Sequence, residues 1–342
     1  MELFITSNPS PETFSILSIN RRNHAVSEQN IIALEPVIKE NIWGGNRLVT
    51  EFHYLEEGSG LGECWGISAH PHGDCRIAEG TYQGKTLSWL YQEHRELFGD
   101  IKSPEFPLLV KIIDAKDKLS IQVHPDDAYA KEHENGSLGK TECWYVMDCP
   151  EHAELIIGHN AKTRQELAEM VHAGRYEELI RRIPVKKGDF VQIVPGTIHA
   201  ITPGMLILET QQSSDVTYRE YDYGRLLSGK PREIHVEQSI AVTNVPDEAD
   251  KKGFIHTQGL CPNKLHELIS CEYYRVFKLN IEGSFTMDQS YPFLLVSVLD
   301  GEGKLGERVI RKGEHFILPA GFGKVAFTGK MEFILSTVGC EK

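Results

Sequence analysis

The sequence has no apolar run of roughly 18 residues, the length of a membrane-spanning helix. It also has no cationic start followed by an apolar core and a small-residue cleavage site, the pattern of a secretory signal. Basic residues are outnumbered, because 36 lysines and arginines stand against 49 aspartates and glutamates, for a formal net charge of −13. Nucleic acids and anionic membranes bind basic surfaces, so we expect neither as a partner, and an anionic ligand would need a local basic pocket. We therefore expect a cytoplasmic protein.

Paired cysteines are also missing. The seven cysteines are odd in number and scattered without paired spacing, which is typical of reduced thiols rather than of a disulfide framework. Cys143 stands next to Glu142, and consecutive side chains leave opposite faces of a strand. We expect Cys143 to pack in the core.

What the sequence does have is length and many short apolar runs. With 342 residues, 40% of them hydrophobic, it can form two compact domains. Runs such as PLLVKII and FVQIVP alternate with turns rich in Gly, Asp and Pro, the pattern of an all-β barrel or sandwich. From Thr163 to Ile183 apolar residues instead recur at helical spacing, interrupted by Gly174. There we predict a pair of helices inserted between strands.

Changes in composition divide the chain. Residues 1–33 mix Ser, Asn, Glu and Pro, and we expect a poorly ordered extension or a small added element. A first domain is predicted over 34–245. Charge, Pro and Gly concentrate from Val242 to Gly253, as in linkers, and a second domain is predicted over 254–342.

Four side chains that can bind a metal stand in strand-like runs. Gln122 and His124 lie two residues apart in the run IQVHP, so they leave the same face of a strand, and Glu142 and His199 lie in later runs. A closed sheet would bring these runs together, and neutral imidazole with carboxylate suits zinc or another first-row divalent ion. Fifteen histidines also make chance pairs common, so the residues alone leave polar surface as the alternative.

The run KGDFVQIVPGTIHA has the form of the second motif of cupin jelly rolls. Gly-Asp opens a strand, Pro-Gly makes a tight turn, and His199 follows where the metal is bound. A plain hairpin is the alternative, since Pro-Gly turns are common. The first cupin motif usually carries His-x-His, and this chain has Gln122-x-His124 there.

A weaker copy of the pattern lies near the C-terminus. The runs LLVSVLDGEGKL and KGEHFILPAGFGKVAF repeat strand, Gly turn and strand, but Lys324 stands where a metal-binding His would be. We predict a degenerate cupin-like β domain without a metal, and we do not assign Lys324 to ligand binding.

Five segments resemble, in this order, the type I mannose-6-phosphate isomerases of the shorter bacterial branch: NIWGG, GECWGISAHPHGD, FPLLVKIIDAKDKLSIQVHPDDAYA, GKTECWYV and PGTIHAI. The specific motifs extend from about Leu34 to Arg225, and the resemblance continues more faintly to the C-terminus. It implies a mainly β chain with a cupin jelly-roll barrel that interconverts mannose 6-phosphate and fructose 6-phosphate with one zinc ion. The implied ligands are His124, Glu142 and His199, with Gln122 as a further ligand in some members.

The resemblance also implies the residues that contact the substrate. Moving a proton between C2 and C1 of a hexose phosphate requires a base, a positive group for the developing oxyanion, and a clamp for the phosphate. Arg219 stands at the position of the family's catalytic arginine. Arg225 falls where many relatives have a phosphate-binding lysine, and Ser120 and Lys140 fall at substrate contacts.

The base has several candidates. Glu209 aligns with a carboxylate proposed as the base in relatives, and Asp215 and a metal-bound water are the alternatives. Apolar neighbours would raise the pKa of Glu209 toward neutrality, whereas a cationic partner would lower it.

Two other functions remain open at this stage. A non-catalytic sugar-binding cupin would not need a basic set together with an intact metal triad. Another metal-dependent cupin enzyme, such as an oxygenase, would ordinarily carry His-x-His in the first motif. The expected partner is a small sugar phosphate, and the sequence indicates nothing about protein partners.

Overall fold

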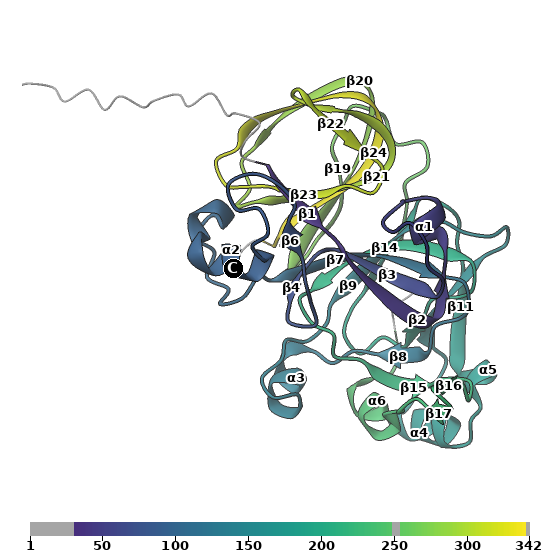
Figure 1. Cartoon of the computed structure of the whole chain (residues 1–342). Helices are drawn as coiled ribbons and strands as arrows, with labels where there is room; N and C mark the ends of the chain where they lie inside the picture. The colour runs from purple at the N-terminus through teal and green to yellow at the C-terminus, as the bar shows by residue number, and fades with distance from the viewer. Residues whose placement is uncertain (1–30, 248–253, 340–342) are drawn as a thin grey trace, which may run out of the picture.

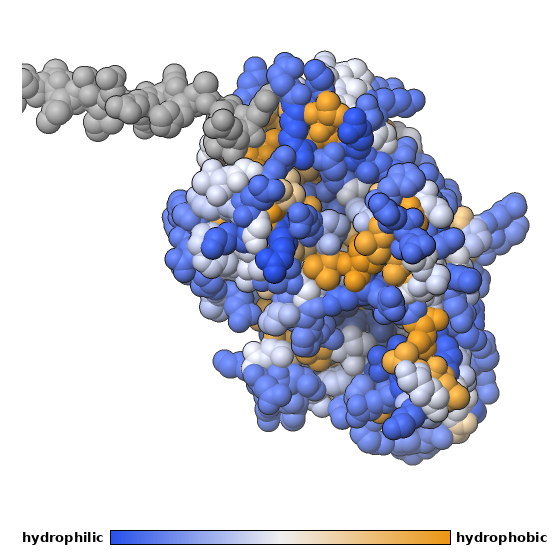
Figure 2. Space-filling model, in the orientation of Figure 1, coloured by the Kyte–Doolittle hydropathy of each residue, from blue (hydrophilic) through white to orange (hydrophobic). Residues whose placement is uncertain are grey.

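The computed structural model describes residues 31–247 and 254–339, which form two antiparallel β barrels joined side by side (Figure 1). Residues 1–30, most of the predicted extension, lie outside the described residues. Within the described ranges no helix is long and apolar enough to cross a membrane. Figure 2 shows that one face of the molecule is mainly hydrophilic, with hydrophobic side chains gathered in small areas.

The N-terminal barrel consists of two sheets that face each other. The larger sheet has seven strands, in the order β18 (Phe254–His256), β12 (Asp189–Ile193), β9 (Glu142–Asp148), β14 (Met205–Gln212), β7 (Leu108–Ala115), β2 (Val37–Gly45) and β3 (Leu61–Ile67). The smaller sheet has five, in the order β11 (Ile180–Pro184), β10 (Glu154–His159), β13 (His199–Ala200), β8 (Ile121–Val123) and β15 (Tyr218–Tyr221). Apolar side chains from both sheets fill the space between them. The predicted cupin jelly roll is confirmed.

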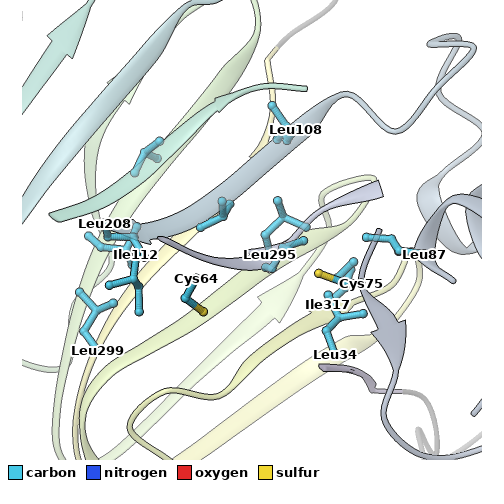
Figure 3. Close-up of a cluster of buried hydrophobic side chains, with 14 of the residues drawn as sticks. Leu34, Cys64, Cys75, Leu87, Leu108, Ile112, Leu208, Leu295, Leu299 and Ile317 are labelled. Atoms are coloured by element: carbon cyan, nitrogen blue, oxygen red, sulfur yellow. The ribbon is translucent and has the colours of Figure 1, made fainter. Parts of the chain in front are cut away.

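Alternation along the larger sheet separates two cores. On β7, Leu108 and Ile112 face the C-terminal barrel, whereas Ile113 faces the inside of the N-terminal barrel. On β9, Cys143 packs in the core between the barrels and Trp144 points inward. Cys143 is therefore a core residue, as predicted. Figure 3 shows part of the core between the barrels.

Helices cover the outer face of the smaller sheet: α4 (Arg164–His172), α5 (Tyr176–Leu179) and α6 (Val236–Val242). Thr163 caps α4, because its hydroxyl accepts a hydrogen bond from the backbone N of Glu166 at 3.1 Å. Gly174, with a φ of +66°, follows the end of α4. The predicted helix pair is confirmed, although its last residues form β11 because they pair with β10. The remaining helical segments lie in loops: α1 (Arg47–Thr50), α2 (Leu87–Glu93), η2 (Arg95–Phe98) and α3 (Asp127–His133).

The C-terminal barrel is built on one eight-stranded sheet. Its strands are β19 (His266–Ser270), β20 (Tyr274–Gln289), β24 (Gly323–Val338), β21 (Leu294–Leu305), β23 (His315–Leu318), β1 (Ile32–Glu35) and β6 (Arg76–Ile77), with β22 (Arg308–Arg311) paired to β21. Among the described residues 254–339, no group of His, Cys, Asp and Glu side chains is placed to hold a metal ion.

Three short strands belong to a different barrel from the one that the predicted domain boundaries assign them to. β1 and β6 pair with each other and β1 extends the C-terminal sheet, although the sequence placed them with the extension and the first domain. β18 pairs with β12 of the N-terminal barrel, although residues 254–256 were assigned to the second domain. In each case the strand covers an edge that would otherwise expose unpaired backbone groups.

Deletion of residues 1–30 should leave the melting temperature and turnover nearly unchanged. The reason is their polar composition, which contributes little to a core. Thermal unfolding and turnover of the shortened chain test this. A large drop in either quantity would show that this segment docks onto the fold.

Candidate active site

Three strands bring together the side chains that the sequence proposed as metal ligands. His199 on β13 pairs with Gln122 on β8, and Glu142 begins β9 on the facing sheet. Nε2 of His199 lies 3.3 Å from Oε1 of Glu142, and Nε2 of His124 lies 3.6 Å from Oε2. The amide nitrogen of Gln122 lies 3.2 Å from Nε2 of His199. The predicted convergence is therefore present in the structure.

Hydrogen bonds fix the orientation of both histidines, His124 and His199. The Nδ1–H of His124 donates to the backbone oxygen of Val216 and that of His199 to the backbone oxygen of Thr197, each at 2.8 Å. Because a carbonyl oxygen can only accept, these bonds fix the tautomer and leave the Nε2 lone pairs facing Glu142. Burial lowers the pKa of His124 well below its usual range and that of His199 to about 4. Both imidazoles are thus neutral, the form that binds a metal.

Local sequence holds these ligands in place. Pro125 follows His124, and Asp126 then caps α3 by accepting a hydrogen bond from the backbone N of Tyr129 at 2.9 Å. On the other side, Gly196 donates its backbone N–H to the oxygen of His124 at 2.9 Å. Gly196 has a φ of +80°, which a residue with a Cβ rarely adopts. The Pro-Gly turn and the capped helix therefore clamp the strand end that carries His124.

The donor set fits a divalent cation. The ligand atoms of His124, Glu142 and His199 all lie within 4.8 Å of one another, and the three side chains are 0–1% exposed. Oε1 of Glu142 is buried without a hydrogen-bond partner in the described part of the chain, as expected of an atom kept for a ligand. Lys140 already places its ammonium against Oε2 of Glu142 and 3.1 Å from Nε2 of His124. The pocket therefore attracts positive charge, and two imidazoles with a carboxylate suit zinc.

Glu209 lies in the wall next to this triad. Its direct neighbours across β7 and β9 are Lys111 and Trp144. Lys111 Nζ lies 3.0 Å from Oε1, and Trp144 Nε1 donates to Oε2 at 2.8 Å. Burial alone would raise the pKa of Glu209, but the ammonium groups of Lys111 and Lys140 lower it to about 2. The sequence left open whether the pKa of Glu209 is raised or lowered, and in the structure its cationic partners lower it.

A cavity of about 270 Å³ opens beside the metal ligands. Gln122 and Lys140 line it and also contact the triad, so they stand between the triad and the cavity. Six of the residues proposed from the sequence line this cavity: Ser120, Gln122, Lys140, Glu209, Asp215 and Arg219. The complete lining holds four cationic side chains and three carboxylates: Lys111, Lys140, Arg219 and Arg232, with Glu63, Glu209 and Asp215.

Arg219 lies on β15 at the cavity. Its Nη1 donates to the backbone oxygen of Glu233 at 2.8 Å, while its Nε is buried without a hydrogen-bond partner among the described residues. Burial and the charge of Arg232 lower the pKa of Arg219 from its usual value. Arg219 therefore contributes a guanidinium to the lining of the cavity.

Asp215 lies at the same cavity, on the loop before β15. His72 Nδ1 contacts its Oδ2, and His70 Nε2 lies 3.5 Å from Oδ1. Its side chain is 39% exposed. Asp215 is therefore a held carboxylate that solvent and ligands can reach.

Arg225, which the resemblance placed at the phosphate, is not among the described residues that line this cavity. Its guanidinium contacts Asp222 and the backbone oxygen of Lys118. The sequence missed Lys111, Trp144 and Arg232, all of which line the cavity. Strand alternation could have indicated Trp144, two residues after Glu142, but no local signal marks the other two.

Glu220 leaves β15 on the face opposite Arg219 and is fully buried. Neither carboxylate oxygen has a hydrogen-bond partner in the described ranges, and burial raises its pKa to about 8. The pKa of this acid is higher in the folded chain than in the unfolded chain. The free energy of unfolding therefore falls as the pH rises from the unfolded pKa through the folded pKa. Glu220→Gln should therefore raise the melting temperature more at pH 8 than at pH 5. An equal gain at both pH values in thermal unfolding would contradict this assignment.

Comparisons with known proteins agree with this geometry. The model of the phosphomannose isomerase type I catalytic domain matches residues 31–157, and that of the mannose-6-phosphate isomerase cupin domain matches residues 264–338. The chain is 48% identical over 307 residues to mannose-6-phosphate isomerase ManA of Bacillus subtilis, covering 88% of this chain and 97% of that protein. It is 49% identical over 309 residues to the mannose-6-phosphate isomerase of Streptococcus mutans, covering 89% and 96%.

A solved structure gives the same result. The crystal structure of the mannose 6-phosphate isomerase from Bacillus subtilis superposes with a TM-score of 0.83 at 44% identity, covering 90% of this chain and 99% of that chain. Sequence, fold and the geometry of the metal ligands lead to one conclusion: the chain belongs to the type I mannose-6-phosphate isomerases.

Proposed function

We propose that this chain interconverts mannose 6-phosphate and fructose 6-phosphate, the reaction of its family, with one zinc ion bound by His124, Glu142 and His199 and more weakly by Gln122. The observation that carries the proposal is that the His124, Glu142 and His199 triad lies directly behind the wall of a cavity that Arg219 also lines. Lys140 and Gln122 contact the triad and line the same cavity as Arg219. The family depends on a metal, and zinc is favoured by neutral imidazoles combined with a carboxylate.

A zinc ion bound here would polarise the sugar oxygens at C1 and C2 as charge develops on them. The chain's own side chains bind and orient the substrate. The ammonium of Lys140 can donate to a sugar oxygen beside the triad, where the hydroxyl of Ser120 also lines the cavity. Arg219 lines the cavity, and its guanidinium can bind the enediolate or the phosphate.

The proton transfer between C2 and C1 requires a group that accepts a proton near neutral pH. Glu209 is poorly suited, because Lys111 and Lys140 lower its pKa to about 2. We assign Glu209 to holding these two lysines at the cavity. Asp215, which is accessible and oriented by two histidines, is the better placed carboxylate.

The test is to supply the zinc-loaded chain with mannose 6-phosphate and to follow the formation of fructose 6-phosphate with a coupled assay. Mannose without the phosphate is the matched control and should react far more slowly. A non-catalytic sugar-binding protein would bind mannose 6-phosphate without forming fructose 6-phosphate, and that result would overturn the proposal.

A further inference from the structure

One buried carboxylate holds two arginines next to the cavity. Arg232 donates from Nε to Oδ2 of Asp222 at 2.8 Å and from Nη2 to Oδ1, and Arg225 donates from Nη2 to the same Oδ1. The side chain of Asp222 is 5% exposed. Because Arg232 engages both carboxylate oxygens through a forked pair of contacts, its orientation is fixed before any ligand arrives.

The chain between the two arginines returns Arg232 to the cavity. It forms a hairpin of β16 (Leu226–Leu227) and β17 (Lys230–Pro231). The residues after the hairpin then lie along β15, since His235 donates its backbone N–H to the oxygen of Arg219 at 2.7 Å. Arg232 consequently lines the cavity together with Arg219.

Arg225 is directed elsewhere. Its Nη1 donates to the backbone oxygen of Lys118, and its guanidinium lies 5.3 Å from the ring centre of Tyr223. The Nη1 group of Arg232, by contrast, makes no hydrogen bond within residues 31–247 and 254–339. Of the two arginines that contact Asp222, only Arg232 both lines the cavity and has an Nη1 group without a hydrogen bond to the described residues.

The charge at this end of the cavity suits a dianion. The guanidinium groups of Arg219, Arg225 and Arg232 lie around the carboxylate of Asp222, and the carboxylate of Glu233 also acts on Arg219, in a chain whose formal net charge is −13. Arginine forks match the oxygens of a phosphate monoester in geometry as well as in charge. A phosphate group is the part of the proposed substrate that carries this charge.

We infer that Arg232 binds the phosphate of the substrate and that Asp222 is the positioning residue that aims it. This inference rests on the proposed function and deepens it, because it names the phosphate contact that the resemblance had placed at Arg225. Arg225 serves instead to complete the ion cluster around Asp222.

The experiment compares Arg232→Ala, Arg232→Lys and Asp222→Asn, with Arg311→Ala as the matched control, since Arg311 is a 63% exposed arginine in the C-terminal barrel. For each zinc-loaded variant, KM and kcat for mannose 6-phosphate and the inhibition constant of inorganic phosphate are measured. Loss of a charge-assisted contact should raise KM and the phosphate inhibition constant roughly 10- to 100-fold in Arg232→Ala. The value of kcat should change far less. Arg232→Lys should recover part of the loss, and Asp222→Asn should shift KM in the same direction.

The outcomes separate this inference from the proposed function. If wild type forms fructose 6-phosphate and Arg232→Ala keeps a KM and a phosphate inhibition constant within twofold of wild type, the inference is wrong and the proposed function stands. A loss of kcat without a change in KM would also overturn it, because Arg232 would then act on the reacting carbons. If Asp222→Asn does not fold, the Arg232 variants decide, since that side chain contributes no core packing.

Discussion

Replacing His124, Glu142 or His199 by alanine should remove most of the bound zinc and nearly all turnover. These side chains supply the buried donor atoms that lie within 4.8 Å of one another, and a site with three strong protein ligands cannot keep its geometry with two. We expect zinc affinity to fall by more than the roughly 10- to 100-fold typical of a change outside the ligands themselves. Elemental analysis after dialysis, together with turnover, gives the result.

Two further variants make this experiment specific. Gln122→Ala should lose less zinc, because a neutral amide is the weakest donor of the four. His172→Ala serves as the control, because this histidine is 54% exposed at the end of α4 and should keep full zinc and turnover. Full zinc occupancy in His199→Ala would show that the assigned triad is not the metal site.

Arg219→Ala should lower turnover strongly while leaving zinc content and folding intact. Nothing in the change touches a proposed metal ligand, but the variant loses a guanidinium from the residues that line the cavity. Removing a charge-assisted contact that strengthens toward the transition state typically costs about 3–4 kcal/mol, or roughly 10²–10³-fold in rate. A surface ion pair would contribute only about 0–1 kcal/mol.

The form of the loss distinguishes Arg219 from Arg232. If Arg219 holds the enediolate, kcat should fall more than KM rises, whereas Arg232→Ala should act mainly on KM. Lysine at 219 keeps the charge but not the fork, so Arg219→Lys should recover only part of the activity. If zinc-loaded Arg219→Ala reacted at nearly the wild-type rate, Arg219 would be a surface residue without a role in the reaction.

Strand periodicity explains part of the predicted convergence of Gln122, His124, Glu142 and His199. Gln122 and His124 share a face because side chains alternate along β8, and the same rule sent Cys143 into the core between the barrels. The proposed ligands all lie on strands or at strand ends, so a period of two residues indicated which face each side chain leaves, while the family resemblance indicated which strands come together.

Contacts between distant segments set the limit of that prediction. The low pKa of Glu209 depends on Lys111, which is its direct partner across β14 and β7 although 98 residues separate them in the chain. Arg232 reaches the cavity because the chain turns back through the short hairpin of β16 and β17. β18 pairs with β12, a strand of the N-terminal barrel that comes earlier in the sequence. Residue propensity and strand alternation do not predict these three features. The features depend on which distant strands and segments pair in the fold.

The most direct test of this account is a zinc titration of the metal-free chain with turnover of mannose 6-phosphate as the readout. Because one buried triad at the cavity is proposed to bind the ion, turnover should start near zero, rise in proportion to added zinc, and stop rising at one ion per chain. Full turnover without metal, or a rise that continues to two ions per chain, would contradict it.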